Sequence, residues 1–237
     1  MAGHSHAKNV KRTKDADAKK RSLIFAKMGK NISLLARQGG GGIESNPALR
    51  TMVEKAREMN VPKENIEKAI KKGVGELEES DNLEEFIFEA YGPGGIAVII
   101  EGITDNKNRI LAEFKKILAD HGGKMVETGS VKWLFQHKGS IVVECARCDE
   151  VELIAIESGA EDIRRANNIL NIVTGVEEID KMKRALESAC FKVEASLKWI
   201  PSVPVEIGEK DKERADRMFE ELESNEDIQG IYWNIKE

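Results

Sequence analysis

The spacing of apolar residues changes near residue 82, and this change divides the chain into a helical part and an α+β part. Before that point apolar side chains recur every three or four residues, as in Phe25, Met28, Ile32 and Leu35, which places them on one face of a helix. After it, β-rich runs alternate with turn glycines and helical patterns. The sequence therefore predicts an α+β protein with three domains, an all-helical N-terminal domain followed by two α+β (ferredoxin-like) domains.

Three helices are expected in the N-terminal part, residues 1–75. Residues 1–14 are small, polar and basic, which is typical of a flexible arm. The first helix would then begin near Asp15 and end at the glycines of residues 39–42. Those glycines could let the backbone approach a phosphate, or they could be a plain connector.

Local signals place the other two helices. Asn46 is a good N-cap, and Pro47 suits the first helical position because the N–H there has no partner within the helix. The third helix is expected to start at Pro62 and to stop at Gly73, with an acidic linker at residues 75–82.

Two sheets are expected in the remainder. Residues 139–198 follow the order β-α-β-β-α-β, which is the ferredoxin-like plan. Residues 82–136 look incomplete alone, so we expect residues 80–137 and 200–237 to share one sheet, with residues 138–199 inserted as a separate domain. Contiguous domains remain the alternative. The elements expected outside the insert are strands at 85–91, 96–103, 131–135, 203–207 and 228–235, a helix capped by Thr104 or Asp105, and a helix at 211–223.

Charge is distributed unevenly along the chain. Residues 1–72 hold 17 Lys and Arg against 7 Asp and Glu, whereas the rest holds 20 basic against 35 acidic residues. Such asymmetry indicates a localised surface for a polyanion, with the acidic remainder facing away from it.

The densest basic cluster covers the arm and the first helix. Lys and Arg side chains that neutralise phosphates release counterions, which drives binding. A solvated charged face is the plain alternative, but the density of the cluster and the charge asymmetry favour nucleic acid. The predicted nucleic-acid-binding residues are Lys8, Lys11, Arg12, Lys14, Lys19, Lys20, Arg21, Lys27 and Lys30.

Two loops are further candidates for contact with a partner. The turn at residues 92–95 is first a hairpin turn, and the segment at residues 104–109 is first a helix cap. Each could also offer backbone or cationic groups to an anionic partner. The possible partner-contact residues are Gly92, Gly94, Gly95, Lys107 and Arg109.

The remaining signals argue against other classes of protein. Cys145 and Cys148 form a CxxC without a complete set of zinc ligands, so we expect incidental cysteines, no metal and no cofactor. No Ser-His-Asp or Cys-His order stands out, so no enzyme is expected. The aliphatic run at residues 96–100 is too short to cross a bilayer and no secretory signal is evident, which favours a cytoplasmic protein without a membrane partner. A monomer is favoured.

Six motifs follow one another over roughly residues 1–135. They are Gly3-His4-Ser5 with Asn9-Val10-Lys11-Arg12; the glycine run with Asn46-Pro47-Ala48-Leu49-Arg50; Val61-Pro62-Lys63-Glu64-Asn65-Ile66-Glu67-Lys68-Ala69-Ile70; Tyr91-Gly92-Pro93-Gly94-Gly95; Thr104-Asp105-Asn106-Lys107-Asn108-Arg109; and His121-Gly122-Gly123 with Gly129-Ser130-Val131. In this order they resemble the YebC/PmpR family, whose mitochondrial members include a translational activator of cytochrome c oxidase.

The resemblance implies a three-domain architecture and a role in gene expression. Bacterial members are described as DNA-binding transcriptional regulators, and other members look like ribosome-associated translation factors. The chain departs from the family at His6-Ala7, where Lys-Trp is usual, so an aromatic that could stack on a base is missing. It also departs at residues 124–128, where the family has more glycine and asparagine.

These observations together predict a non-enzymatic nucleic-acid-binding regulator of gene expression. The resemblance favours a DNA-binding transcriptional regulator. A ribosome-associated translation factor bound to ribosomal RNA is the first alternative, and the small basic part beside an acidic body slightly favours it. An adaptor that binds proteins through its acidic domains is the second alternative.

Overall fold

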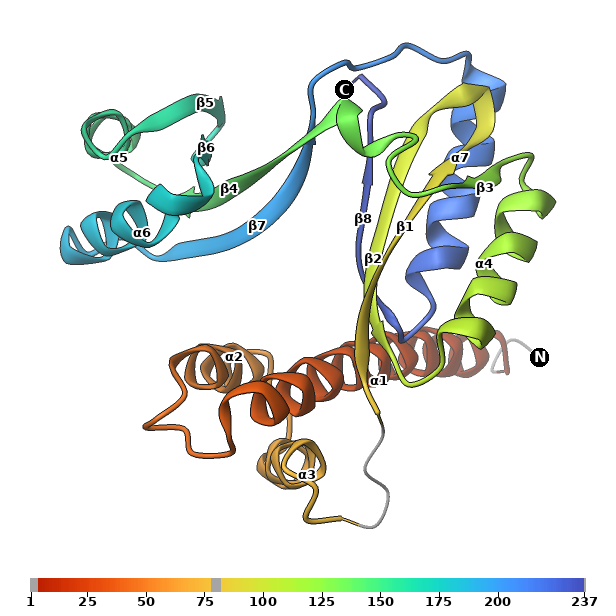
Figure 1. Cartoon of the computed structure of the whole chain (residues 1–237), viewed down its shortest axis with the longest axis horizontal. Coiled ribbons are helices and arrows are strands. Elements are labelled where there is room, and N and C mark those ends of the chain that lie inside the picture. The colour runs from red at the N-terminus through yellow and green to blue at the C-terminus, as the bar shows by residue number, and fades with distance from the viewer. Residues whose placement is uncertain (1–3, 78–81, 237) are drawn as a thin grey trace. The chain divides into compact units, whose positions relative to one another are not determined.

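The structure is a computed structural model that describes residues 4–77 and 82–236, and within them the side chains from residue 18 onward. It is an α+β protein with an N-terminal helical region and two four-stranded sheets, as the sequence predicts (Figure 1). Two compact units result: Met1–Glu127 with Ile207–Ile231, and Thr128–Glu206 with Tyr232–Glu237. In the described part of the chain, no helix is both long and apolar enough to cross a membrane.

The helical region consists of α1 (His4–Gly39), α2 (Pro47–Glu58) and α3 (Lys63–Gly73). The expected flexible arm at residues 1–14 is wrong for residues 4–14, which belong to α1, while residues 1–3 lie outside the described part. The reason is local, because residues 4–28 contain neither Gly nor Pro and nothing stops the helix from extending toward the N-terminus. The apolar stripe of α1 packs with α2 and α3 around Ile32, Leu49 and Val53.

Asn46 fixes the junction between α1 and α2. Its side-chain oxygen accepts from the N–H of Leu49 at 3.1 Å, as expected of an N-cap. Its side-chain nitrogen donates to the carbonyls of Leu35 and Gly40, at 2.9 and 3.0 Å. One buried amide therefore ends the first helix and begins the second.

Helices α1 and α3 approach closely at Gly73. The Ser33 hydroxyl of α1 donates to the Ala69 carbonyl of α3 at 2.7 Å. A side-chain carbon at Gly73 would collide with the Ser33 backbone, so only glycine allows this crossing.

The first sheet belongs to the same compact unit as the helical region. Its order is β3-β1-β2-β8, and α4 covers it through Phe114, whose ring lies 5.8 Å from the rings of Phe86 and Phe88 on β1. Helix α7 packs beside α4. The elements are β1 (Glu84–Tyr91), β2 (Ala97–Thr104), α4 (Lys107–Asp120), β3 (Lys124–Val126), α7 (Glu209–Glu223) and β8 (Ile228–Trp233), with a 3-10 turn at Pro93–Gly95.

Three local expectations are corrected around this sheet. Asn106, and neither Thr104 nor Asp105, caps α4, and its side chain accepts from the Arg109 N–H at 3.0 Å. The strand expected at residues 131–135 is instead a 3-10 turn at Lys132–Leu134, whereas the unexpected β3 pairs with β1. The strand expected at residues 203–207 is reduced to one bridge between Val205 and Ile235. Whether such a short segment forms a strand depends on its pairing with residues that are remote in the sequence.

The second sheet has the order β5-β6-β4-β7, which is the ferredoxin-like arrangement of its βαββαβ segment. Its core is built around Ile141, Leu170 and Met182. The elements are β4 (Phe135–Glu144), α5 (Cys148–Glu157), β5 (Ala160–Ala166), β6 (Ile169–Thr174), a 3-10 turn at Val176–Glu178, α6 (Ile179–Ser188) and β7 (Val193–Pro201).

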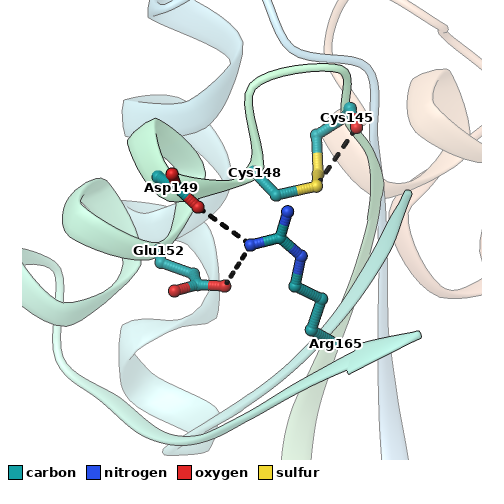
Figure 2. The surroundings of a disulfide bond; sticks show 5 residues. All are labelled: Cys145, Cys148, Asp149, Glu152 and Arg165. Atoms are coloured by element: carbon teal, nitrogen blue, oxygen red, sulfur yellow. Dashed lines mark hydrogen bonds and ion pairs between the residues drawn. A yellow bond between two sulfur atoms is a disulfide. The ribbon is translucent and has the colours of Figure 1, made fainter. Parts of the chain in front are cut away.

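The cysteines of the CxxC form a disulfide, so their interpretation as incidental is corrected. Cys148 opens α5, and the preceding turn brings Cys145 within 5.2 Å of it between Cα atoms, a separation that a disulfide spans. Figure 2 shows Arg165 of β5 beside this bond, with its guanidinium paired to Asp149 at 2.8 Å and Glu152 at 3.6 Å. Cys190 is a free, exposed cysteine.

Candidate nucleic-acid interface

The predicted nucleic-acid-binding residues all lie on α1. Lys8, Lys11, Arg12 and Lys14 belong to this helix by their backbone, and their side chains lie outside the described part. The described members fall into two groups along the helix. Lys19, Lys20 and Arg21 form the first group, and Lys27 and Lys30 form the second.

The first group is exposed to solvent. Lys19, Lys20 and Arg21 stand one after another on α1. They form no ion pair with any side chain that the structure describes. Their charge is therefore available to an outside anion, as a phosphate-binding surface requires.

The second group binds to the protein itself. The Lys27 ammonium donates to the Glu223 carbonyl at the end of α7, 3.0 Å away. Burial in this contact lowers the pKa of Lys27. The Lys30 ammonium pairs with Glu226 at 3.0 Å and with Asp227. These two cations hold α1 against the turn that leads into β8.

Asp227 collects several donors in that turn. Its carboxylate is completely buried and accepts from Lys30, from the Thr104 hydroxyl at 3.1 Å and from Arg109 at 2.8 Å. Because these donors come from α1, the end of β2 and the start of α4, one carboxylate joins the helical region to the first sheet. A buried carboxylate needs such partners to stay charged.

Arg109 has further partners on its own helix. Its guanidinium contacts Asp105 at 2.9 Å and Glu113 at 3.5 Å. The hydrogen bond from Arg109 lowers the pKa of Asp105, and the pKa of Arg109 is raised in return. Lys107 pairs with Glu84 at 2.8 Å. Both cations of the 104–109 segment thus have acidic partners within the protein.

The glycine turn is partly covered by α7. A side chain on Gly92 would meet Met218, and one on Gly94 would meet Ile207 and Asp211. Gly94 and Gly95 have positive φ angles of 70° and 78°, which glycine adopts readily, and both remain exposed. Any backbone contact with a partner would therefore be made at Gly94 and Gly95.

The structure adds cations that the sequence analysis did not single out. They stand on the exposed faces of α2 and α3, where the basic excess of residues 1–72 was the only sequence signal. They are Lys55, Arg57, Lys68 and Lys71.

A shallow groove of about 360 Å³ lies beside the free cations of α1. Lys20 and Arg21 line one part of it, and Ile24, Phe25 and Met59 line the rest. Sequence reasoning had assigned Phe25 to the core alone and had missed Met59, because only the packing of α2 on α1 brings Met59 to this place. In the described part of the chain, no three His, Cys, Asp or Glu side chains are grouped so that they could hold a metal ion.

The fold and the groove define a class of protein: a multidomain α+β protein with a cationic helical region. Family models identify it further. The model described as "TACO1/YebC protein N-terminal domain" matches residues 5–76, and the one described as "TACO1/YebC second and third domain" matches residues 83–235. The chain belongs to the TACO1/YebC family.

Full-length relatives support this assignment. A protein named "Probable transcriptional regulatory protein" from Thermotoga maritima is 44% identical, and the match covers 100% of this chain and 94% of the relative. A protein of the same name from Syntrophus aciditrophicus is 43% identical over 99% of this chain and 95% of the relative. The crystal structure of a conserved hypothetical protein, Aq1575, from Aquifex aeolicus has a TM-score of 0.84 and 38% identity, covering 92% of this chain and 90% of that chain.

Proposed function

We propose that this protein is a non-enzymatic, cytoplasmic regulator of gene expression that binds nucleic acid through α1. The observation that carries the proposal is the contrast along this helix. Lys19, Lys20 and Arg21 are exposed and form no ion pair with any described side chain, whereas Lys27 and Lys30 hold the helix in place. The names of the relatives support a regulator of transcription.

A translation factor bound to ribosomal RNA is the second candidate. The exposed positions of α2 and α3 carry mainly Lys and Glu, with one Arg (Arg57) and one Asn (Asn65), whereas a helix that reads the DNA major groove presents several Arg, Asn or Gln side chains to base edges. Contacts of Lys with phosphates position a protein without specifying a sequence. This surface therefore suits a folded RNA at least as well as a DNA operator.

A comparison of ligands tests the proposal. The full-length protein would be sedimented with ribosomes and, separately, with genomic DNA fragments at the same near-physiological salt concentration. The test variant is Lys20→Glu with Arg21→Glu. The control is Lys115→Glu with Lys116→Glu, which makes the same charge change on exposed positions of α4.

The proposal expects saturable binding to at least one ligand, with the α1 variant at least about tenfold weaker and the α4 control unchanged. Ribosome binding with only weak, unsaturable DNA binding would favour the translation factor, and sequence-selective DNA binding would favour the transcriptional regulator. Equal binding by the α1 variant and wild type would contradict the role of α1. It would direct attention to the acidic α+β domains and the adaptor alternative.

A further inference from the structure

The groove beside Lys20 and Arg21 combines two chemistries in one place. On a helix, residues four apart are neighbours, so Lys20 lies next to Ile24 and Arg21 lies next to Phe25. Each cation therefore has an apolar side chain directly beside it, pointing into the same groove. An ordinary solvated charged face differs from this groove because it has no apolar surface beside its cations.

The floor of the groove is held by the core below it. Phe25 is half-buried and packs against the apolar cluster shared by α1, α2 and α3. Ile24 and Met59 keep 37% and 44% of their surface exposed, so apolar area remains uncovered in the same groove. An incoming flat, apolar group would bury this area without disturbing the core.

The end of α2 sets the position of Met59. Asn60 has a positive φ of 59° and ends the helix, and the Val61 N–H then returns to the Ala56 carbonyl at 2.9 Å. The Met59 N–H still bonds to the Lys55 carbonyl at 3.1 Å. The backbone that carries Met59 is therefore hydrogen-bonded on both sides, and the wall of the groove is built before any ligand arrives.

A second groove in the helical region differs from the α1 groove in the charges of its lining residues. It has a volume of about 430 Å³ and lies between residues 41–42 and α3. Its lining carries Glu67 and Glu76 beside Lys71, so it offers a phosphate more repulsion than attraction. Among the described residues that line it, the α1 groove has two cations and no carboxylate.

We propose that the groove between α1 and the end of α2 binds one unpaired nucleotide, with its base on Ile24, Phe25 and Met59 and its phosphate on Lys20 and Arg21. This inference rests on the proposed function and names its ligand. Bases in a duplex are stacked on one another and cannot reach an apolar floor, whereas loops and single strands present them.

The test measures how much a base adds to binding. Full-length protein would be titrated with a labelled 12-nucleotide RNA, the DNA strand of the same sequence, the corresponding duplex, and single strands of the same length in which every nucleotide is abasic. Stacking on an apolar or aromatic surface predicts that intact single strands bind about fivefold or more tightly than abasic ones. The RNA and DNA arms separate the two sources of an unpaired nucleotide.

Three variants separate the parts of the site. Ile24→Ser with Met59→Ser removes exposed apolar surface and should reduce the preference for intact over abasic strands below about twofold, with an unchanged salt dependence. Lys20→Gln with Arg21→Gln should weaken all strands and reduce the salt dependence. Leu153→Ser with Ile156→Ser, which changes side chains 63% and 64% exposed on α5, is the matched apolar control and should change neither quantity. Circular dichroism confirms that each variant is folded.

The outcomes distinguish the two proposals. Salt-dependent binding with equal affinity for intact and abasic strands, or tightest binding to the duplex, would overturn the nucleotide site and leave the proposed function standing. The absence of binding to every strand and to the duplex would overturn the nucleotide site, and failure to bind ribosomes and genomic DNA as well would overturn both. A crosslink from 4-thiouridine to the peptides carrying Phe25 or Met59 is expected in addition, and crosslinks confined to other segments would contradict the site.

Discussion

At the residue scale, Asp227 shows why a lysine cannot be assigned to a ligand from its charge alone. Lys30 and Lys20 look alike in the sequence, yet the ammonium of Lys30 forms an ion pair with the carboxylate of Asp227, 197 residues away. Arg109 reaches the same carboxylate from 118 residues away. The unexpected function of these two cations is to keep a buried charge compensated.

This role predicts the effect of Asp227→Asn on stability. The change leaves Lys30 without its buried partner, and breaking a buried ion pair typically costs about 3 kcal/mol or more. We expect the free energy of unfolding, followed by circular dichroism in urea, to fall by roughly that amount. Glu226→Gln is the control, because Glu226 is largely exposed and should cost less than about 1 kcal/mol. Equal losses in the two variants would contradict the central position of Asp227.

Asp105 provides a prediction about pH. Its pKa in the folded protein lies below the ordinary value of 3.8 because Arg109 donates a hydrogen bond to it. A carboxylate whose folded pKa is depressed contributes stability above its unfolded pKa, and that contribution disappears as the pH falls through the folded pKa. Asp105→Asn should therefore lower the Tm slightly at pH 7, and the difference should shrink as the pH falls below 3.8 and through the folded pKa of Asp105.

The size of this effect is limited by solvent. The Asp105 side chain is 48% exposed, so its pair with Arg109 should contribute less than about 1 kcal/mol. Thermal unfolding of wild type and variant between pH 2 and pH 7 checks the prediction. A difference in Tm that is independent of pH would mean that Asp105 acts through packing or capping and not through its charge.

At the scale of elements, local chemistry predicted the parts of the fold whose ends are set by neighbouring residues. Asn46-Pro47 and Pro62 placed α2 and α3, and the turn at residues 92–95 placed the β1–β2 hairpin. The βαββαβ order predicted the second sheet. Each of these signals acts within a few residues, so it can be recognised in the sequence.

The expectations that were wrong or incomplete concern features that depend on residues remote in the sequence. Strand β3 has three residues and exists because Met125 lies opposite Ala90 on β1. The α1 groove depends in the same way on Met59 meeting Ile24 and Phe25 across two helices. The cationic half of the candidate site was therefore predictable from composition, whereas its apolar half required the tertiary structure.

The disulfide that opens α5 leads to a prediction for this element. For a closed loop of four residues, the chain-entropy relation gives a stabilisation of about 2 kcal/mol. We expect Cys145→Ser with Cys148→Ser to lower the stability of the second sheet by about that amount under oxidising conditions. Adding a reductant should not lower the stability of this variant any further. Cys190→Ser is the matched control and should leave the stability unchanged.

Thiol counting examines the same bond directly. Denatured, unreduced protein should react with thiol reagents at Cys190 alone, and reduction should expose three thiols. Three reactive thiols before reduction would show that Cys145 and Cys148 remain a dithiol.

At the scale of the whole molecule, charge separation makes binding directional. Residues 1–72 carry 17 basic against 7 acidic residues, while the remainder carries 20 against 35. A polyanion is attracted to the first set and repelled by the second, so binding through the helical region costs the least electrostatic work.

This separation predicts how binding responds to salt. Each neutralised phosphate of a single strand contributes about 0.7 to the slope of log affinity against log salt. Changing Lys19, Lys20 and Arg21 to Gln should therefore reduce the magnitude of that slope by about 2, as measured by anisotropy titrations between 50 and 300 mM salt (roughly the range in which counterion release dominates). Lys115→Gln with Lys116→Gln should leave the slope unchanged, because those cations lie in the acidic remainder. If the triple variant kept the wild-type slope, the phosphates would be neutralised elsewhere, and Lys55, Arg57, Lys68 and Lys71 on α2 and α3 would be the residues to change next.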